Sequence, residues 1–119
     1  MKTAIPRTSV PMWRVAIVEN SAEDRDDIRR LLLKGSDRRY QFIEAETGAA
    51  GLRCILDTSN GPPDCVVLDY TLPDMDALEV LAGTLGADGL TVCPVVVVTG
   101  TADARFGPAV QAVHSWQVL

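Results

Sequence analysis

Three apolar segments of the sequence end in residues that can bind a cation or react with a phosphoryl group. Glu19 and Asn20 end one segment, Asp69 ends another, and Thr99 ends a third. Carboxylate, amide and hydroxyl oxygens gathered in one place suit a hard divalent cation such as Mg2+. A carboxylate beside such a cation can act as a nucleophile toward a phosphoryl donor, because the metal relieves the repulsion between the two anions.

A simpler explanation exists for each of these residues taken singly. Acidic residues that follow buried strands often form turns or cap helices, and Asn20 can be a cap for the helix that follows it. The coincidence of polar residues at three strand ends favours a shared site over three separate turns. Both explanations stay open for Asn20.

The segments around these residues alternate between strand-like and helix-like patterns. Short β-branched apolar runs predict buried strands, and wider apolar spacing predicts helices, the first of them capped by Ser21. The expected strands cover residues 13–18, 40–45, 65–68, 94–98 and 116–119. The expected helices cover residues 22–34, 48–56 and 76–85, with a further one at 102–113 that Gly107-Pro108 interrupts.

This alternation predicts an α/β protein with a doubly wound parallel sheet. Each crossover between parallel strands is right-handed and covers apolar strand surface with a helix. Ligands bind such sheets at the carboxyl ends of the strands, near the point where the strand order reverses. Glu19, Asn20, Asp69 and Thr99 are therefore expected at one edge.

Length and composition limit the domain organisation and the partners. The chain has 119 residues, enough for one core, and we expect residues 1–12 to be an arm and residues 13–119 to be the domain. The formal net charge of -5 argues against nucleic-acid binding, and no apolar run approaches the length of a membrane span. Three cysteines without metal-ligand spacing fit a reducing cytoplasm, and His114 as the single histidine excludes a multi-histidine metal site.

Three segments of the sequence resemble the receiver domain of two-component response regulators. They read VAIVENSAEDR, PDCVVLDYTLPDMDALEVL and VVVVTGTAD, in the family's order and spacing, over about residues 13 to 113. The resemblance implies the flavodoxin-like (CheY-like) fold with strand order 2-1-3-4-5. It also implies a signalling protein that accepts a phosphoryl group from a histidine kinase or a phosphotransfer protein. Such a protein is a phosphoacceptor that assists its own phosphorylation and dephosphorylation, not an enzyme in the ordinary sense.

Carried over position by position, the resemblance assigns roles to individual residues. Asp69 would be the phosphoacceptor and Thr99 the switch hydroxyl that binds the aspartyl phosphate. The Mg2+ ligands would be Glu19, Asn20, Asp69 and the backbone carbonyl of Thr71.

Two departures from the family pattern bear on function. Asn20 stands where the family has a second acidic metal ligand, so weaker Mg2+ binding is expected. The sequence ends without the family's Lys-Pro pair and fifth helix, and its lysines are Lys2 and Lys34. The missing helix 5 predicts an uncovered apolar edge. We expect a second copy of the chain in a homodimer, a swapped element or the rest of a longer protein to bury it.

These departures keep alternative functions open. The chain can instead be a degenerate receiver that works as a phosphorylation-independent interaction or dimerisation module. A phosphatase-like hydrolase is less favoured, because Thr71 stands where a second aspartate would be needed. The charged stretch from Glu23 to Arg30 is interpreted as the solvated face of its helix, with a docking surface for the kinase as the alternative.

Overall fold

The computed structural model describes residues 12–34, 38–57, 59–98 and 116–118 of the chain. Within these ranges the chain forms five strands and three helices. They are β1 (Met12–Val18), α1 (Ala22–Leu33), β2 (Arg39–Ala45), α2 (Gly48–Leu56), β3 (Cys65–Asp69), α3 (Ala77–Gly83), β4 (Val95–Val98) and β5 (Trp116–Val118).

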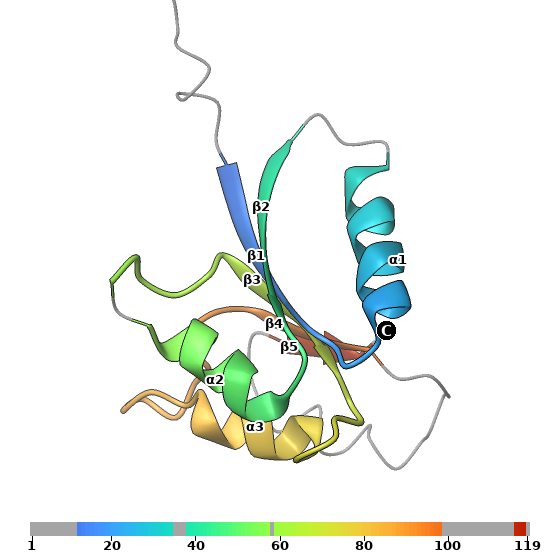
Figure 1. Ribbon diagram of the computed structural model, residues 1–119. Coiled ribbons are helices and arrows are strands. Elements are labelled where there is room, and N and C mark those ends of the chain that lie inside the picture. The colour runs from blue at the N-terminus through green and yellow to red at the C-terminus, as the bar shows by residue number, and fades with distance from the viewer. Residues whose placement is uncertain (1–11, 35–37, 58, 99–115, 119) are drawn as a thin grey trace, which may run out of the picture.

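The strands form one parallel sheet in the order β2-β1-β3-β4-β5. Helix α1 lies on one face of this sheet, and α2 and α3 lie on the other (Figure 1). The predicted doubly wound α/β fold and the 2-1-3-4-5 strand order are therefore confirmed. The expected helix at 102–113 and residues 1–11 of the expected arm lie outside the described residues, while Met12, the last residue assigned to the arm, begins β1.

Side-chain caps fix where the helices begin. The Ser21 hydroxyl accepts a hydrogen bond from the Asp24 backbone N–H at 3.2 Å, so Ser21 caps α1 as predicted. Helix α3 is shorter than the predicted 76–85. Asp76 forms a capping box with Glu79 and stands outside the helix, and the Thr84 hydroxyl donates to the Leu81 carbonyl at the other end.

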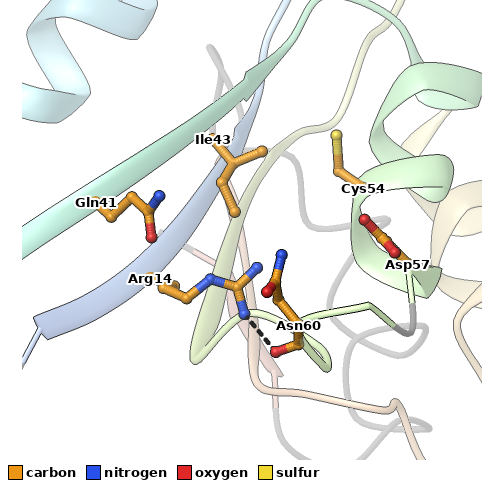
Figure 2. A pocket seen from close by; sticks show the side chains of 6 residues that line it. All are labelled: Arg14, Gln41, Ile43, Cys54, Asp57 and Asn60. Carbon is orange, nitrogen blue, oxygen red and sulfur yellow. Dashed lines mark hydrogen bonds between the residues drawn. The ribbon is translucent and has the colours of Figure 1, made fainter.

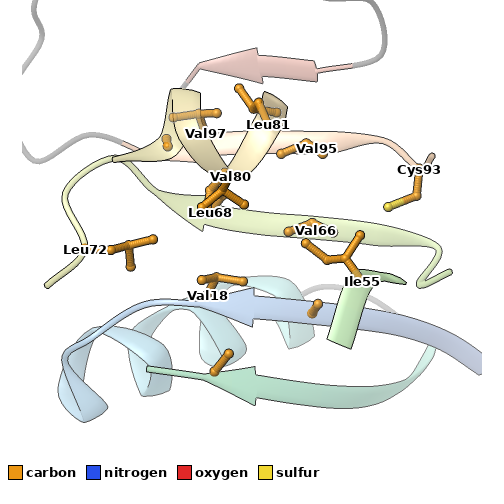
Figure 3. Packing of buried hydrophobic residues seen from close by; sticks show 13 residues of the cluster. Val18, Ile55, Val66, Leu68, Leu72, Val80, Leu81, Cys93, Val95 and Val97 are labelled. Atoms are coloured by element: carbon orange, nitrogen blue, oxygen red, sulfur yellow. The ribbon is translucent and has the colours of Figure 1, made fainter. Parts of the chain in front are cut away.

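The main core lies between the sheet and the pair α2 and α3 (Figure 3). Alternate residues of β1, β3 and β4 point into it, and Val18, Leu68 and Val97 are almost completely buried. Helix α2 comes very close to β1 at Gly51, where an added Cβ would lie 2.8 Å from both methyl carbons of Val18. Glycine at this position permits the close contact between helix and strand.

The described residues cover the opposite face less completely. Helix α1 packs Ile28 and Leu32 against a smaller cluster of Val15, Ile17 and Val67. Beside α1 lies a groove of about 620 Å³, lined mainly by apolar side chains of α1 and of the first four strands. Leu31 at this groove is 71% exposed.

A second hollow, of about 450 Å³, lies toward the amino ends of β1 and β2 (Figure 2). The Arg14 guanidinium at this hollow donates to the carbonyls of Asn60, Gly61 and Pro62. Arg14 thus holds the loop before β3 against β1. Its contacts explain this arginine without a ligand.

Candidate functional site at the strand ends

The register of the sheet brings Glu19 and Asp69 to the same edge. Val18 of β1 pairs with Leu68 of β3, so the two acidic residues follow neighbouring strands at the same level. Asp69 itself pairs with Val98, the last residue of β4. Thr99 follows Val98 in the sequence and lies outside the described residues.

Asp69 has an unusually high carboxyl pKa. Partial burial raises the pKa of Asp69 to about 6, and the nearby Glu19 carboxylate adds to the rise. The backbone N–H groups of Thr71 and Tyr70 oppose this shift, and Asp24 contributes a small further increase in the pKa. The fold therefore holds an acidic group where its negative charge is poorly stabilised.

Glu19 and Asn20 differ in how they are held. Glu19 is 8% exposed, and its carboxylate accepts a hydrogen bond from the Ser21 backbone N–H at 2.9 Å. The Asn20 side chain is exposed and makes no hydrogen bond to any described residue. The alternative that Asn20 caps α1 is wrong, because the Ser21 hydroxyl occupies that role.

The loop after β3 presents the backbone of Thr71. An isolated bridge pairs Thr71 with Asp76, and its hydrogen bonds use the carbonyls of Tyr70 and Met75. Within the described part of the chain, no donor reaches the Thr71 carbonyl. This oxygen is thus available to a ligand, in the loop that follows Asp69.

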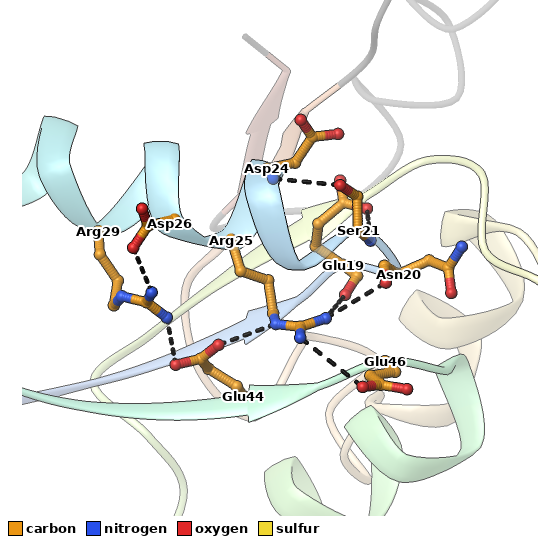
Figure 4. Close-up of polar contacts among 9 residues, drawn as sticks. All are labelled: Glu19, Asn20, Ser21, Asp24, Arg25, Asp26, Arg29, Glu44 and Glu46. Atoms are coloured by element: carbon orange, nitrogen blue, oxygen red, sulfur yellow. Dashed lines mark hydrogen bonds and ion pairs between the residues drawn. The ribbon is translucent and has the colours of Figure 1, made fainter.

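A buried arginine underlies the turn that contains Glu19 and Asn20 (Figure 4). Arg25 is 9% exposed, and its Nη1 donates to the Glu19 carbonyl at 2.7 Å and to the Asn20 carbonyl at 3.3 Å. Its Nε donates to Glu44 of β2 at 2.8 Å. The interpretation of residues 23–30 as a solvated face is therefore wrong for Arg25, which points inward with Ile28.

Asp74 joins the loop after β3 to α2 in a similar way. Its carboxylate accepts hydrogen bonds from the backbone N–H groups of Gly48 at 2.7 Å and Ala49 at 2.9 Å, in the first turn of α2. These bonds lower the pKa of Asp74. Residue types and spacing predicted a solvated position for Arg25 and no role for Asp74. For Arg25 a signal was present, because it lies three residues before Ile28 and seven before Leu32, on the helix face that packs against the sheet.

Comparison with known proteins identifies this arrangement. The response regulator Rcp1, in its Mn(2+)-bound form, superposes with a TM-score of 0.73 and 28% identity, over 90% of this chain and 79% of that one. A CheY-like receiver domain protein from Methanospirillum hungatei JF-1 has the same fold, with a TM-score of 0.65 and 21% identity over 91% of this chain and 82% of its own. The chain is a response-regulator receiver domain.

Sequence comparison agrees with this assignment. The transcriptional regulatory protein KdpE of Mycobacterium tuberculosis (strain CDC 1551 / Oshkosh) is 39% identical to the receiver domain over 77 residues, which are 65% of this chain and 31% of KdpE. The chain thus spans about a third of the length of this curated relative. No model of a known protein family matches the sequence. In the described ranges, no helix of the receiver domain has the length and apolar character that crossing a membrane requires.

The donors at this edge fit a divalent cation. Two carboxylates lie close enough for Glu19 to raise the pKa of Asp69, and a cation between them would relieve that repulsion. The Thr71 carbonyl and the Asn20 amide, close in sequence to Asp69 and Glu19, would add neutral oxygen donors. Among the described residues no group of three or more acidic, histidine or cysteine side chains is clustered as a metal site, so any cation would depend on these neutral oxygens and on water.

Proposed function

We propose that this receiver domain accepts a phosphoryl group on Asp69 from a histidine kinase or a phosphotransfer protein, with Mg2+ as cofactor. The observation that carries the proposal is the position of Asp69, which is partly buried at the end of β3 beside Glu19 in a receiver fold. With a pKa of about 6, the carboxylate is mostly ionised at pH 7 and can act as a nucleophile.

The transfer exchanges one bond to phosphorus for another. A carboxylate oxygen of Asp69 forms a bond to phosphorus as the bond between phosphorus and the donor nitrogen breaks, and the donor keeps that electron pair. Bound Mg2+ would supply positive charge that reduces repulsion between the phosphoryl oxygens and the two carboxylates. Glu19, Asn20, Asp69 and the Thr71 carbonyl would hold the ion. Thr99 is the switch hydroxyl in this proposal, and the exchange takes place in the cytoplasm.

Intact mass spectrometry after incubation with acetyl phosphate and Mg2+ tests the phosphoacceptor. We expect the wild-type chain to gain the mass of one phosphoryl group and Asp69→Asn to gain none. Asp88→Asn is a matched control, because Asp88 lies in an exposed turn away from β3 and an amide oxygen can still accept its hydrogen bond from Leu90. A modified Asp69→Asn chain would contradict the assignment.

A phosphorylation-independent interaction module is the second candidate. It is favoured by Asn20, whose exposed amide removes one negative charge from the cation site. In this case neither wild type nor variant gains mass at saturating Mg2+ and donor, and the receiver fold serves for binding alone.

We further propose that a second copy of the chain covers the groove beside α1. The groove has a volume of about 620 Å³, and Trp13 and Leu31 are exposed apolar side chains on its walls. In a twofold dimer the same patch lies on both copies, so each chain buries the groove of the other. A stable monomer in sedimentation velocity at high concentration would contradict this assembly.

A further inference from the structure

Arg25 holds the backbone carbonyls of the turn that contains Glu19 and Asn20. The Arg25 guanidinium donates from one nitrogen to both carbonyls, at 2.7 and 3.3 Å. In Figure 4 the Asn20 amide extends away from this guanidinium. Bonds to the carbonyls leave the carboxylate and amide oxygens of the turn for other ligands.

The other end of the guanidinium reaches β2 and the residue after it. Its Nε bonds Glu44 at 2.8 Å, and its Nη2 lies 3.7 Å from the Glu46 carboxylate. Arg29 also pairs with Glu44, so two cations of α1 hold this carboxylate. The Arg25 side chain is only 11% exposed and Glu44 is 35% exposed, so solvent screens this ion pair less than the pair with Glu46, whose side chain is 71% exposed.

The loop that carries Thr71 is tied to the same part of the chain. Asp74 accepts its two hydrogen bonds from Gly48 and Ala49, directly after the segment that pairs with Arg25. Residues 44–49 are therefore a common anchor for two loops. One loop holds Glu19 and Asn20, and the other holds Thr71.

We propose that Arg25 and Asp74 are positioning residues, which hold the two ligand-bearing loops at a fixed separation through residues 44–49 and so preform the cation site. The inference rests on the proposed function and names residues that act through the ligands without touching the cation. Because Asn20 supplies an amide in place of a carboxylate, the site attracts a cation less strongly by charge. Its affinity for the cation therefore depends more on ligands that are already in position before the cation binds.

The direction in which Arg25→Gln changes the affinity for a divalent cation distinguishes a positioning role from a simple effect of charge. Arg25 is a cation near a cation site, so by charge alone Arg25→Gln makes binding of a divalent cation tighter. If Arg25 positions the turn, the same substitution makes binding weaker. Loss of an outer-shell partner typically lowers metal affinity by about ten-fold or more.

Electron paramagnetic resonance of free Mn2+ during titration with the full chain measures this affinity. We expect Arg25→Gln to raise the Kd for Mn2+ about ten-fold and Asp74→Asn to raise it about three-fold or more. Arg25→Lys keeps the charge and one donor group, so partial rescue is expected. Arg30→Gln is the matched control, because it removes an exposed cation of α1 that pairs with Asp26 and Asp27, and its Kd should equal that of the wild type or be slightly lower.

Urea unfolding of each variant shows that the titrations use folded protein. If Arg25→Gln does not fold, Arg25→Lys decides the question, because it keeps the charge and a raised Kd then supports positioning. Wild-type or lower Kd values in the folded Arg25 variants overturn this inference alone. Absence of Mn2+ binding by the wild-type chain overturns the proposed metal-assisted function together with the inference.

Discussion

The face of the sheet under α2 and α3 is closed by side chains, whereas the face beside α1 keeps an apolar groove. The strands are apolar on both faces: Val66 and Leu68 of β3 point to one side, and Val67 points to the other. Among the described residues, the difference therefore comes from the helices. Helix α2 contacts β1 at a glycine, while α1 places charged residues along much of its length.

The largest expected effect tests whether the two faces differ in packing. Ile55 of α2 is 1% exposed, and Ile55→Ala leaves a cavity in the closed face. We expect the free energy of unfolding to fall by about 2–5 kcal/mol. Leu31→Ala, on the groove, should change it by less than about 0.5 kcal/mol. Urea unfolding at pH 7 measures both, and equal losses would mean that the faces are packed alike.

A second test concerns Asp69, at the edge of the sheet where the carboxyl ends of the strands lie. Because the pKa of Asp69 is about 6 in the folded chain and near 4 in an unfolded one, ionisation of this carboxyl destabilises the fold. Asp69→Asn removes that cost, so we expect it to stabilise the chain by about 1–3 kcal/mol above pH 6. The gain should shrink as the pH falls from 6 to 4 and vanish below 4.

Urea unfolding in EDTA across this pH range measures the effect of Asp69→Asn. Asp88→Asn provides the control, since it removes an exposed carboxylate and should change stability little at any pH in the range. A stability difference that is independent of pH would show that the charge of Asp69 is not its cause.

A third substitution tests whether the glycine contact between α2 and β1 allows the close packing of this face. Gly51→Ala places a methyl group 2.8 Å from two carbons of Val18, a stiff side chain in a buried strand. We expect a loss of about 1–2 kcal/mol despite the better helix propensity of alanine. Gly83→Ala meets the end of the half-buried Leu52 side chain, which can move, so its loss in the same assay should be smaller. The reverse order would contradict this account.

The smallest change in stability is expected on the open face. Leu31→Glu places a charge at the groove, and the free energy of unfolding should change by less than about 0.5 kcal/mol. Its effect should instead be on assembly, because burying a carboxylate in an apolar interface is unfavourable. Sedimentation velocity should show less dimer than for the wild type. An unchanged distribution would remove Leu31 from the interface.

Much of the fold could be predicted because the strands are short and strongly apolar. The pattern located α2 at 48–56 and the ends of the other described elements within one or two residues. Helix α3 was predicted too long at its carboxyl end, since Leu85 continues the apolar spacing. The helix ends where the Thr84 hydroxyl donates to the Leu81 carbonyl, near the glycines at 83 and 86. Apolar spacing alone does not show that this hydrogen bond competes with continuation of the helix.

The site was only partly predictable. The strand ends identified Glu19 and Asp69, because parallel strands bring their carboxyl ends to one edge whatever the details of packing. Arg25 and Asp74 were missed, since Arg25 bonds carbonyls of the turn before α1 and carboxylates of distant residues, and Asp74 bonds backbone N–H groups of α2. Contacts of that kind depend on how the loops fold, and residue type and spacing do not encode them directly.

The parallel order of the strands also affects how the chain can fold. Strand β1 lies between β2 and β3, so its second neighbour is synthesised only when the chain has reached Asp69. Every ladder in the sheet joins segments separated by a long connection, which makes folding slow compared with that of helical bundles of similar size. Until β3 docks, the long β1 strand has an open edge during translation, when contact with other nascent chains is most damaging.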